Sequence, residues 1–275
     1  MAPSRLQIDL LGLVPRKALT RTVGRAAKLH NAMAVRRFAA AYGLDMSEAE
    51  RPLEDYPNIH ELFTRRLKPG VRPVDPNPQA LVSPVDGSLS ERGPIGDGVL
   101  PQAKGRTYGL AALLAEPDAP SRYAEGSFGT IYLSPTDYHR MHSPVDGQLT
   151  EWTHVPGDLW PVNRASVAHV DALFAKNERL IFFIETETFG RVAMVMVGAT
   201  IVGKVRASFD PELISHVPGR RDVHRGHLDR EVKRGEELAV FEMGSTVILV
   251  TERPIQGWPE AGSAVRLGTA LGTVS

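Results

Sequence analysis

The sequence predicts an α+β protein in which a helical N-terminal region precedes a larger, mainly β domain. Residues 5–43 place apolar and basic side chains at helical spacing, and their charge differs from that of the rest of the chain. Beyond residue 70, short aliphatic runs alternate with Gly, Pro and Asp, a pattern typical of short strands joined by turns. We therefore divide the 275 residues into an N-terminal region, residues 1–70, and a β domain, residues 71–275.

The N-terminal region is predicted to form basic amphipathic helices. Its basic side chains recur at i, i+4, i+8 and i+11 and therefore lie on one stripe. The stripe consists of Lys17, Arg21, Arg25 and Lys28, and the other side carries Leu19, Val23, Ala26 and Ala27. Pro15 suits the first turn of a helix. A further helix is expected over residues 59–68, ahead of a proline-rich connector that begins at Pro69.

Positive charge is concentrated at the start of this otherwise neutral chain. Residues 1–43 hold eight Lys or Arg residues and one acid, Asp9. The asymmetry predicts an anionic partner, and we favour an anionic phospholipid membrane because a basic amphipathic helix can lie among lipid headgroups. Nucleic acid is not expected, since no aromatic interleaving accompanies the charge. The alternative is a helix that packs on the domain and leaves its basic face solvated.

The β domain contains an internal repeat of sequence. Residues 83–91, SPVDGSLSE, recur as residues 143–151, SPVDGQLTE, and each copy combines a proline lead-in, an Asp-Gly turn and a strand. Short Gly-spaced strands are expected over residues 233–240 and 262–272. This texture resembles the barrel-sandwich folds of lipoyl- and biotinyl-type domains. Those domains modify a hairpin lysine, whereas the comparable stretch here holds Gly244-Ser245.

Composition excludes several classes of chemistry. The chain has no cysteine, so disulfides, cysteine-ligated zinc, iron–sulfur clusters and a thiol nucleophile are excluded. No metal site is expected, because His139 and His142 lack the flanking glutamate of zinc-hydrolase helices and no acids cluster beside them. The sequence also has no signal-peptide pattern and no apolar run of 18 or more residues.

Ser245 is the candidate nucleophile, although a Gly-Ser pair alone is usually a turn. Asp86, His139 and His142 supply the other groups of a nucleophile–base–orienter relay. The strand predicted from Thr246 to Val250 would hold the serine at its start. A serine hydrolase is disfavoured, because the Gly-x-Ser-x-Gly nucleophile elbow is missing.

Six segments resemble, in order, the proenzymes of the phosphatidylserine decarboxylase family, of the bacterial membrane-associated type. Two are the most specific, YHRMH at residues 138–142 and GST at residues 244–246. The others are FTRRLKP at residues 63–69, RP at 72–73, SPVDG at 83–87 and QAKG at 102–105. The segments lie between residues 63 and 246, and the resemblance as a whole covers roughly residues 5–255. The family's usual leucine before Gly-Ser-Thr is replaced here by Met243, an apolar exchange.

The resemblance implies a self-processing enzyme. Ser245 would attack the carbonyl of Gly244 with His142 as base and Asp86 as its orienting partner, and β-elimination would follow. The products would be a large chain, residues 1–244, and a small chain, residues 245–275, which begins with a pyruvoyl cofactor made from Ser245.

The pyruvoyl group would form a Schiff base with phosphatidylserine, and loss of CO₂ would give phosphatidylethanolamine. His139 is the candidate for proton transfer, and Tyr138, Arg140 and Thr246 are candidates for holding carboxylate or phosphate. The resemblance further implies a peripheral protein on the cytoplasmic face of the cell membrane, with the two chains paired and this pair dimerised. Residues 216–227, basic and broken by Gly and Pro, are expected to form a loop near the lipid.

Two other functions stay open from the sequence. One is decarboxylation of a different amine-bearing carboxylate, because the residues do not specify the headgroup. The other is a non-catalytic lipoyl-like binding module carried on a membrane-surface helix.

Overall fold

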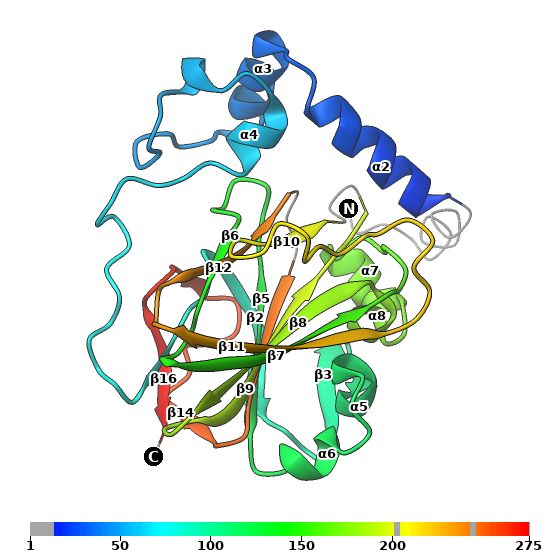
Figure 1. Ribbon diagram of the computed structural model, residues 1–275, viewed down its shortest axis with the longest axis vertical. Helices are drawn as coiled ribbons and strands as arrows, with labels where there is room; N and C mark the ends of the chain where they lie inside the picture. Colours follow the sequence, from blue (N-terminus) through cyan, green and yellow to red (C-terminus); the bar gives the residue numbers. More distant parts are fainter. Residues whose placement is uncertain (1–13, 201–203, 243–245, 275) are drawn as a thin grey trace.

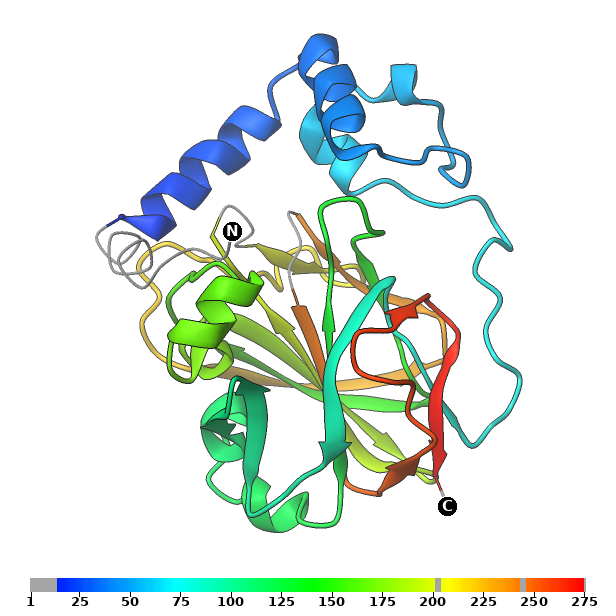
Figure 2. The same cartoon turned by 180° about the vertical axis from the view of Figure 1, so that it is seen from behind.

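The structure is an α+β arrangement in which short helices surround mainly antiparallel sheets (Figures 1 and 2). The computed structural model describes residues 14–200, 204–242 and 246–274. In Figure 1 the N-terminal helices lie above one end of the β domain. Within the described ranges, no helix is both long enough and apolar enough to cross a membrane.

The N-terminal region forms several short helices rather than one long one. They are α2 (Arg16–Ala27), α3 (Ala32–Tyr42), the 3₁₀ helix η1 (Leu53–Asp55) and α4 (Ile59–Phe63). Pro15 is the N-cap of α2, as expected for a helix start. The Asn31 side chain accepts a hydrogen bond from the Ala34 amide, which begins α3, and left-handed Gly43 ends it.

The helix predicted over residues 59–68 is twice as long as the observed helix α4. It ends at Phe63 because the next residues pair with another segment of chain. The Glu50 amide donates to the Arg66 carbonyl and the Lys68 amide donates to the Glu48 carbonyl, which makes residues 66–68 extended. Tertiary pairing therefore overrides the local helical pattern.

An eight-stranded antiparallel sheet forms the centre of the β domain, in the order β11-β7-β8-β9-β13-β5-β2-β15. Its strands are β2 (Gly87–Pro94), β5 (Ser127–Tyr132), β7 (Gly147–Val155), β8 (Arg179–Thr186), β9 (Gly190–Val197), β11 (His224–Val232), β13 (Thr246–Thr251) and β15 (Ala264–Val265). The loop predicted over residues 216–227 is wrong in its last part, because residues 224–227 belong to β11 and pair with β7.

Three small sheets and four short helices complete the domain. The sheets are β1-β16-β14, β10-β12-β6 and β3-β4. Their strands are β1 (Ala80–Val82), β3 (Val99–Ala103), β4 (Arg106–Gly109), β6 (Arg140–His142), β10 (Val205–Ala207), β12 (Glu237–Phe241), β14 (Ile255–Gln256) and β16 (Ala270–Val274). The helices are α5 (Leu110–Leu114), α6 (Ala119–Arg122), α7 (Arg164–His169) and α8 (Leu173–Lys176).

Both faces of the central sheet are buried at its middle strands, whereas most residues of the edge strand β11 are exposed or half-buried. Along β13, Val247 and Leu249 face one apolar cluster, and Ile248 and Val250 face a second cluster on the side of the short helices. All six residues of β13 are buried, as predicted for this run of β-branched and aliphatic residues. The central strand that follows the Gly-Ser pair is thus held by apolar contacts on both of its faces.

The two copies of the repeated sequence lie beside each other. In each copy a buried serine donates to the carbonyl two residues on, Ser83 to Val85 and Ser143 to Val145. The copies also exchange main-chain hydrogen bonds, because the Val82 amide donates to Pro144 and the His142 amide donates to Pro84.

Candidate active site

The candidate site surrounds the connection between β12 and β13. Gly244 and Ser245 lie in this connection, outside the described residues. β12 belongs to the small β10-β12-β6 sheet, whereas β13 lies between β5 and β9 in the central sheet. The Phe241 amide at the end of β12 donates to the carbonyl of His139 at 3.0 Å. Of the two predicted histidines, His139 therefore has its main chain at this end of β12.

His139 is buried and has one ring nitrogen free. Its Nδ1 lies 2.8 Å from the Asp137 carbonyl, so Nδ1 carries the proton and Nε2 keeps its lone pair. Nε2 has no hydrogen-bond partner among the described residues. The ring stacks on Phe63, with centroids 3.9 Å apart. Burial lowers the pKa of His139 to about 3, so the ring is neutral at physiological pH.

His142 is oriented by contacts on both ring nitrogens. Nδ1 lies 2.7 Å from the Gly235 carbonyl, and Nε2 lies 3.2 Å from the Tyr138 hydroxyl, which donates to it. Burial lowers the pKa of His142, and the hydrogen bond to Gly235 opposes that shift. His142 is paired with Glu237 at the start of β12, so its main chain is farther from the end of that strand than that of His139.

Asp86 is bound by the connector that precedes it and by the main chain of Leu267. Its Oδ1 accepts from Arg72 Nε at 2.9 Å and from the Leu267 amide at 2.8 Å. Arg72 also donates to Glu48. Hydrogen bonds from Arg72 and Arg266 lower the pKa of Glu48 to about 2. No hydrogen bond joins Asp86 to His142 within the described ranges, although the negative charge of Asp86 acts to raise the pKa of His142.

The three predicted substrate-binding residues differ in their surroundings. Arg140 is engaged by protein groups, since it donates from Nε to the Thr64 carbonyl and from an Nη atom to Glu237 at 2.8 Å. Tyr138 contacts His142, as described above. Thr246, the first residue of β13, is buried, and its hydroxyl has no partner among the described residues.

Asp137 is a polar group of the site that sequence reasoning missed. Burial raises its pKa, and a hydrogen bond from Ser134 opposes the shift. Asp137 and Asp86 line one cavity of about 310 Å³ together with Arg65 and Tyr138. The signal was its position inside the segment that carries both histidines, but nothing local distinguished it from a turn residue.

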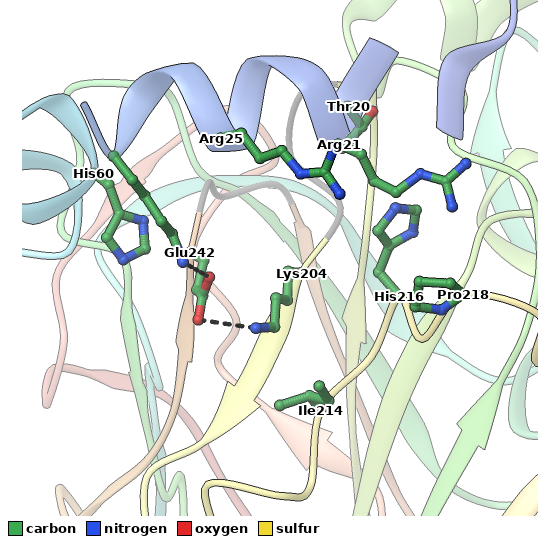
Figure 3. Close-up of a pocket in the computed structure, with 11 residues that line it drawn as sticks. Thr20, Arg21, Arg25, His60, Lys204, Ile214, His216, Pro218 and Glu242 are labelled. Atoms are coloured by element: carbon green, nitrogen blue, oxygen red, sulfur yellow. Dashed lines mark hydrogen bonds and ion pairs between the residues drawn. The ribbon is translucent and has the colours of Figure 1, made fainter. Parts of the chain in front are cut away.

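A second cavity, of about 300 Å³, lies beneath α2 (Figure 3). Its walls carry four Lys or Arg side chains, two histidines and one carboxylate, Glu242. Glu242 is the residue before the 243–245 connection, and it accepts from Lys28 Nζ at 3.0 Å. Lys204 and Arg206 also lie within ion-pair distance of Glu242. The basic stripe of α2 therefore faces the β domain next to the candidate site.

The fold, with a buried neutral His139 beside the end of β12 and His142 on the neighbouring strand, suits a decarboxylase that processes its own chain. The profile of the phosphatidylserine decarboxylase family matches residues 59–273, and the chain belongs to that family. A phosphatidylserine decarboxylase proenzyme of Myxococcus xanthus (strain DK1622) is 43% identical, with 98% of each chain covered. Proenzymes of Anaeromyxobacter sp. (strain K) and Brevibacillus brevis are 45% and 40% identical at the same coverage.

Proposed function

We propose that this protein converts phosphatidylserine to phosphatidylethanolamine and CO₂ after cutting its own chain. The observation that carries the proposal is an identity of 40–45%, over nearly the full chain, to phosphatidylserine decarboxylase proenzymes. Every predicted catalytic residue falls inside the matched range 59–273. The free lone pair of His139, next to the end of β12, supplies a base where the chemistry needs one.

We assign the cutting step to Ser245, His142 and Asp86. The hydroxyl of Ser245 attacks the Gly244 carbonyl, and a neutral imidazole is required to accept the hydroxyl proton. His142 suits this role because its Nδ1 proton is held by Gly235 and its Nε2 is an acceptor. Asp86, bound by Arg72, favours the imidazolium of His142 through its negative charge and not through a direct hydrogen bond.

The surroundings of position 245 fit a pyruvoyl group. Two buried polar atoms without partners, His139 Nε2 and the Thr246 hydroxyl, belong to segments that border the connection, and they can bind the carbonyl oxygens or the amine of a substrate. A pyruvoyl group at position 245 would supply a ketone for the substrate amine and an electron sink for the pair left by CO₂.

In the decarboxylation step we assign proton transfer to His139. Its Nε2 accepts a hydrogen bond from the substrate amine and passes a proton to the α-carbon after CO₂ has left, and the low pKa of the buried ring means that the imidazolium forms only transiently. Tyr138 and Thr246 remain candidates for holding the substrate. Arg140 acts instead by fixing β6, because its guanidinium is already bound to Glu237 and to the Thr64 carbonyl.

We propose peripheral binding to the cytoplasmic face of an anionic membrane. Four of the seven exposed large apolar side chains in the described ranges lie in the N-terminal region: Leu19, Leu29, Met33 and Tyr42. Such side chains can enter the acyl boundary while nearby basic residues meet headgroups. The processed large and small chains stay together as a heterodimer, which pairs further as the family resemblance suggests. We also interpret the repeated segments, which exchange hydrogen bonds, as two halves of a barrel-sandwich-like unit.

A denaturing gel with intact mass tests the cutting step. The wild-type chain is expected to give two products, of residues 1–244 and 245–275, with the smaller one blocked at its start. Ser245→Ala is expected to stay whole and to release no CO₂ from phosphatidylserine. A single uncut chain in active wild-type protein would contradict the proposed self-cleavage. Cutting that persists in Ser245→Ala would show that the cleavage site lies elsewhere in the chain.

The two histidines are separated by the same assay. His142→Ala is expected to stay uncut, whereas His139→Ala is expected to be cut and yet to release CO₂ at least 100-fold more slowly, as for loss of a general base. The opposite result would exchange the two roles. A cut enzyme that ignores phosphatidylserine but decarboxylates another amine-bearing carboxylate would support the alternative substrate.

A further inference from the structure

Three cations of the basic stripe of α2 line a cavity while they remain exposed to solvent. Arg21, Arg25 and Lys28 line the cavity from the helix, and Lys204 and His216 line it from the β domain. Figure 3 shows Arg21 and Arg25 extending from the helix toward His216, with Lys204 and Glu242 on the other side. The apolar residue Leu19 of the same helix is also exposed. A ligand that enters from solvent can therefore reach these cations.

Only part of this positive charge is neutralised by the protein. Glu242 is the only carboxylate among the lining residues, and it accepts from Lys28 and is paired with Lys204. It is also paired with Arg206, just outside the lining. Arg21 and Arg25 make no ion pair or side-chain hydrogen bond with any described residue. An anion in the cavity would meet two guanidinium groups whose donors are unused.

His216 is held firmly in the cavity wall. Its amide and its Nδ1 both bind the buried carboxylate of Glu178, and His154 binds the same carboxylate at 2.8 Å. His216 has a φ of +57°, a left-handed conformation that costs free energy in a non-glycine residue and is found at ligand sites. Its Nε2 is buried and has no partner among the described residues. The ring is fixed while one nitrogen stays available.

We propose that this cavity binds the phosphodiester of the lipid headgroup, with Arg21 and Arg25 as its ligands and His216 as a fixed part of the wall. The inference rests on the proposed function. In phosphatidylserine only two carbon atoms separate the phosphodiester oxygen from the amine nitrogen. Glu242, the last described residue before the 243–245 connection, lines the cavity, so a phosphodiester held here lies beside the end of β12 from which the chain continues to position 245. The acyl chains then leave past the exposed apolar side of the helix.

The test uses short-chain phosphatidylserine below its micelle concentration, so that membrane binding plays no part. Arg21→Gln with Arg25→Gln is expected to raise KM roughly tenfold or more and to leave kcat nearly unchanged, because charge-assisted hydrogen bonds to the bound phosphodiester are lost. Rates are normalised to the amount of blocked small chain. Replacing both arginines by lysine is expected to recover part of the loss, since the charge remains and the fork does not.

A matched control removes the same charge from the same basic region. Arg36→Gln with Arg37→Gln changes two exposed α3 arginines that do not line the cavity. Both double variants are expected to bind anionic vesicles less tightly at low salt, but only the α2 variant should change KM on the soluble substrate. An α2 variant whose KM stays within twofold of wild type overturns the proposal.

Competing ligands identify the anion. Glycerophosphoserine is expected to inhibit competitively, and at lower concentration than inorganic phosphate; equal inhibition by the two would overturn the headgroup assignment. If the α2 variant is not cut, calorimetric binding of glycerophosphoserine to uncut Ser245→Ala, with and without the two arginines, decides the question. A wild-type chain that neither cuts nor decarboxylates overturns the proposed function, whereas an unchanged KM in the variant overturns only this cavity.

Discussion

Replacing Glu178, the residue before β8, by glutamine should destabilise the protein more than the same carboxylate-to-amide change at any glutamate of β7, β8 or β9. The Glu178 carboxylate is 3% exposed and binds two histidines, His154 and His216. An amide of the same shape keeps the packing but loses the charge and places an NH₂ group against a ring N–H. The change thus isolates the electrostatic contribution of one buried group.

The magnitude follows from the pKa of that carboxylate. Burial alone would raise the pKa of Glu178, but hydrogen bonds from His154 and His216 lower it from 4.5 to about 2. That difference corresponds to about 3 kcal/mol of folding free energy. Because the folded-state pKa is the lower one, the stabilisation is complete above pH 4.5 and is lost as the pH falls toward 2. The cost of breaking a buried ion pair, about 3 to 5 kcal/mol, is similar.

Urea unfolding at several pH values measures the effect. The uncut Ser245→Ala chain is the right background, because a processed protein unfolds into two chains and is not two-state. We expect Glu178→Gln to lose about 3 kcal/mol at pH 7 and progressively less below pH 4.5. Glu185→Gln on β8, half exposed, should change stability by less than about 0.5 kcal/mol. A loss below about 1 kcal/mol at pH 7, or one that does not vary with pH, would refute the reasoning.

Two further substitutions test other parts of the structure. Between pH 6.5 and 3, His139→Gln should reduce the loss of folding free energy with falling pH, by up to about 1.4 kcal/mol per pH unit. The reason is that burial lowers the pKa of His139 in the folded protein, so the unfolded chain binds this proton at a higher pH. An unchanged slope of stability against pH in urea titrations would contradict this expectation. Gly126→Ala should cost about 2 to 3 kcal/mol, since a Cβ would lie 1.9 Å from the Thr251 carbonyl oxygen. Gly96→Ala, with no atom within 4 Å of the added Cβ, is its control, and equal melting temperatures for the two variants would be the contrary outcome.

Local patterns predicted the elements whose residues decide their own conformation. Pro15 starts α2, and the run after Ser245 is a fully buried strand. The helix at 59–68 failed at Phe63 because residues 66–68 pair with a distant segment, which no local pattern reports. Strand pairing also converted residues 224–227 from loop to β11.

Residue types predicted the members of the site better than their partners. Helical spacing placed Arg21 and Arg25 on one face, but the direction of that face depends on where α2 docks on the β domain. Asp86 was expected beside His142, whereas Arg72 from the proline-rich connector binds its carboxylate. Such pairings depend on a chain path that spacing along the sequence does not encode.

The position of β13 would limit how often one molecule can be supplied with the proposed cofactor. The strand pairs along all six of its residues with β5 on one side and β9 on the other. β15 and β16, farther along the same C-terminal segment, pair with β2 and β1. If the chain is cut before residue 245 as proposed, a small chain paired in this way could not be exchanged without unfolding the protein. Each molecule would then form its pyruvoyl group once, and loss of that group to a side reaction could be repaired only by synthesis of a new chain.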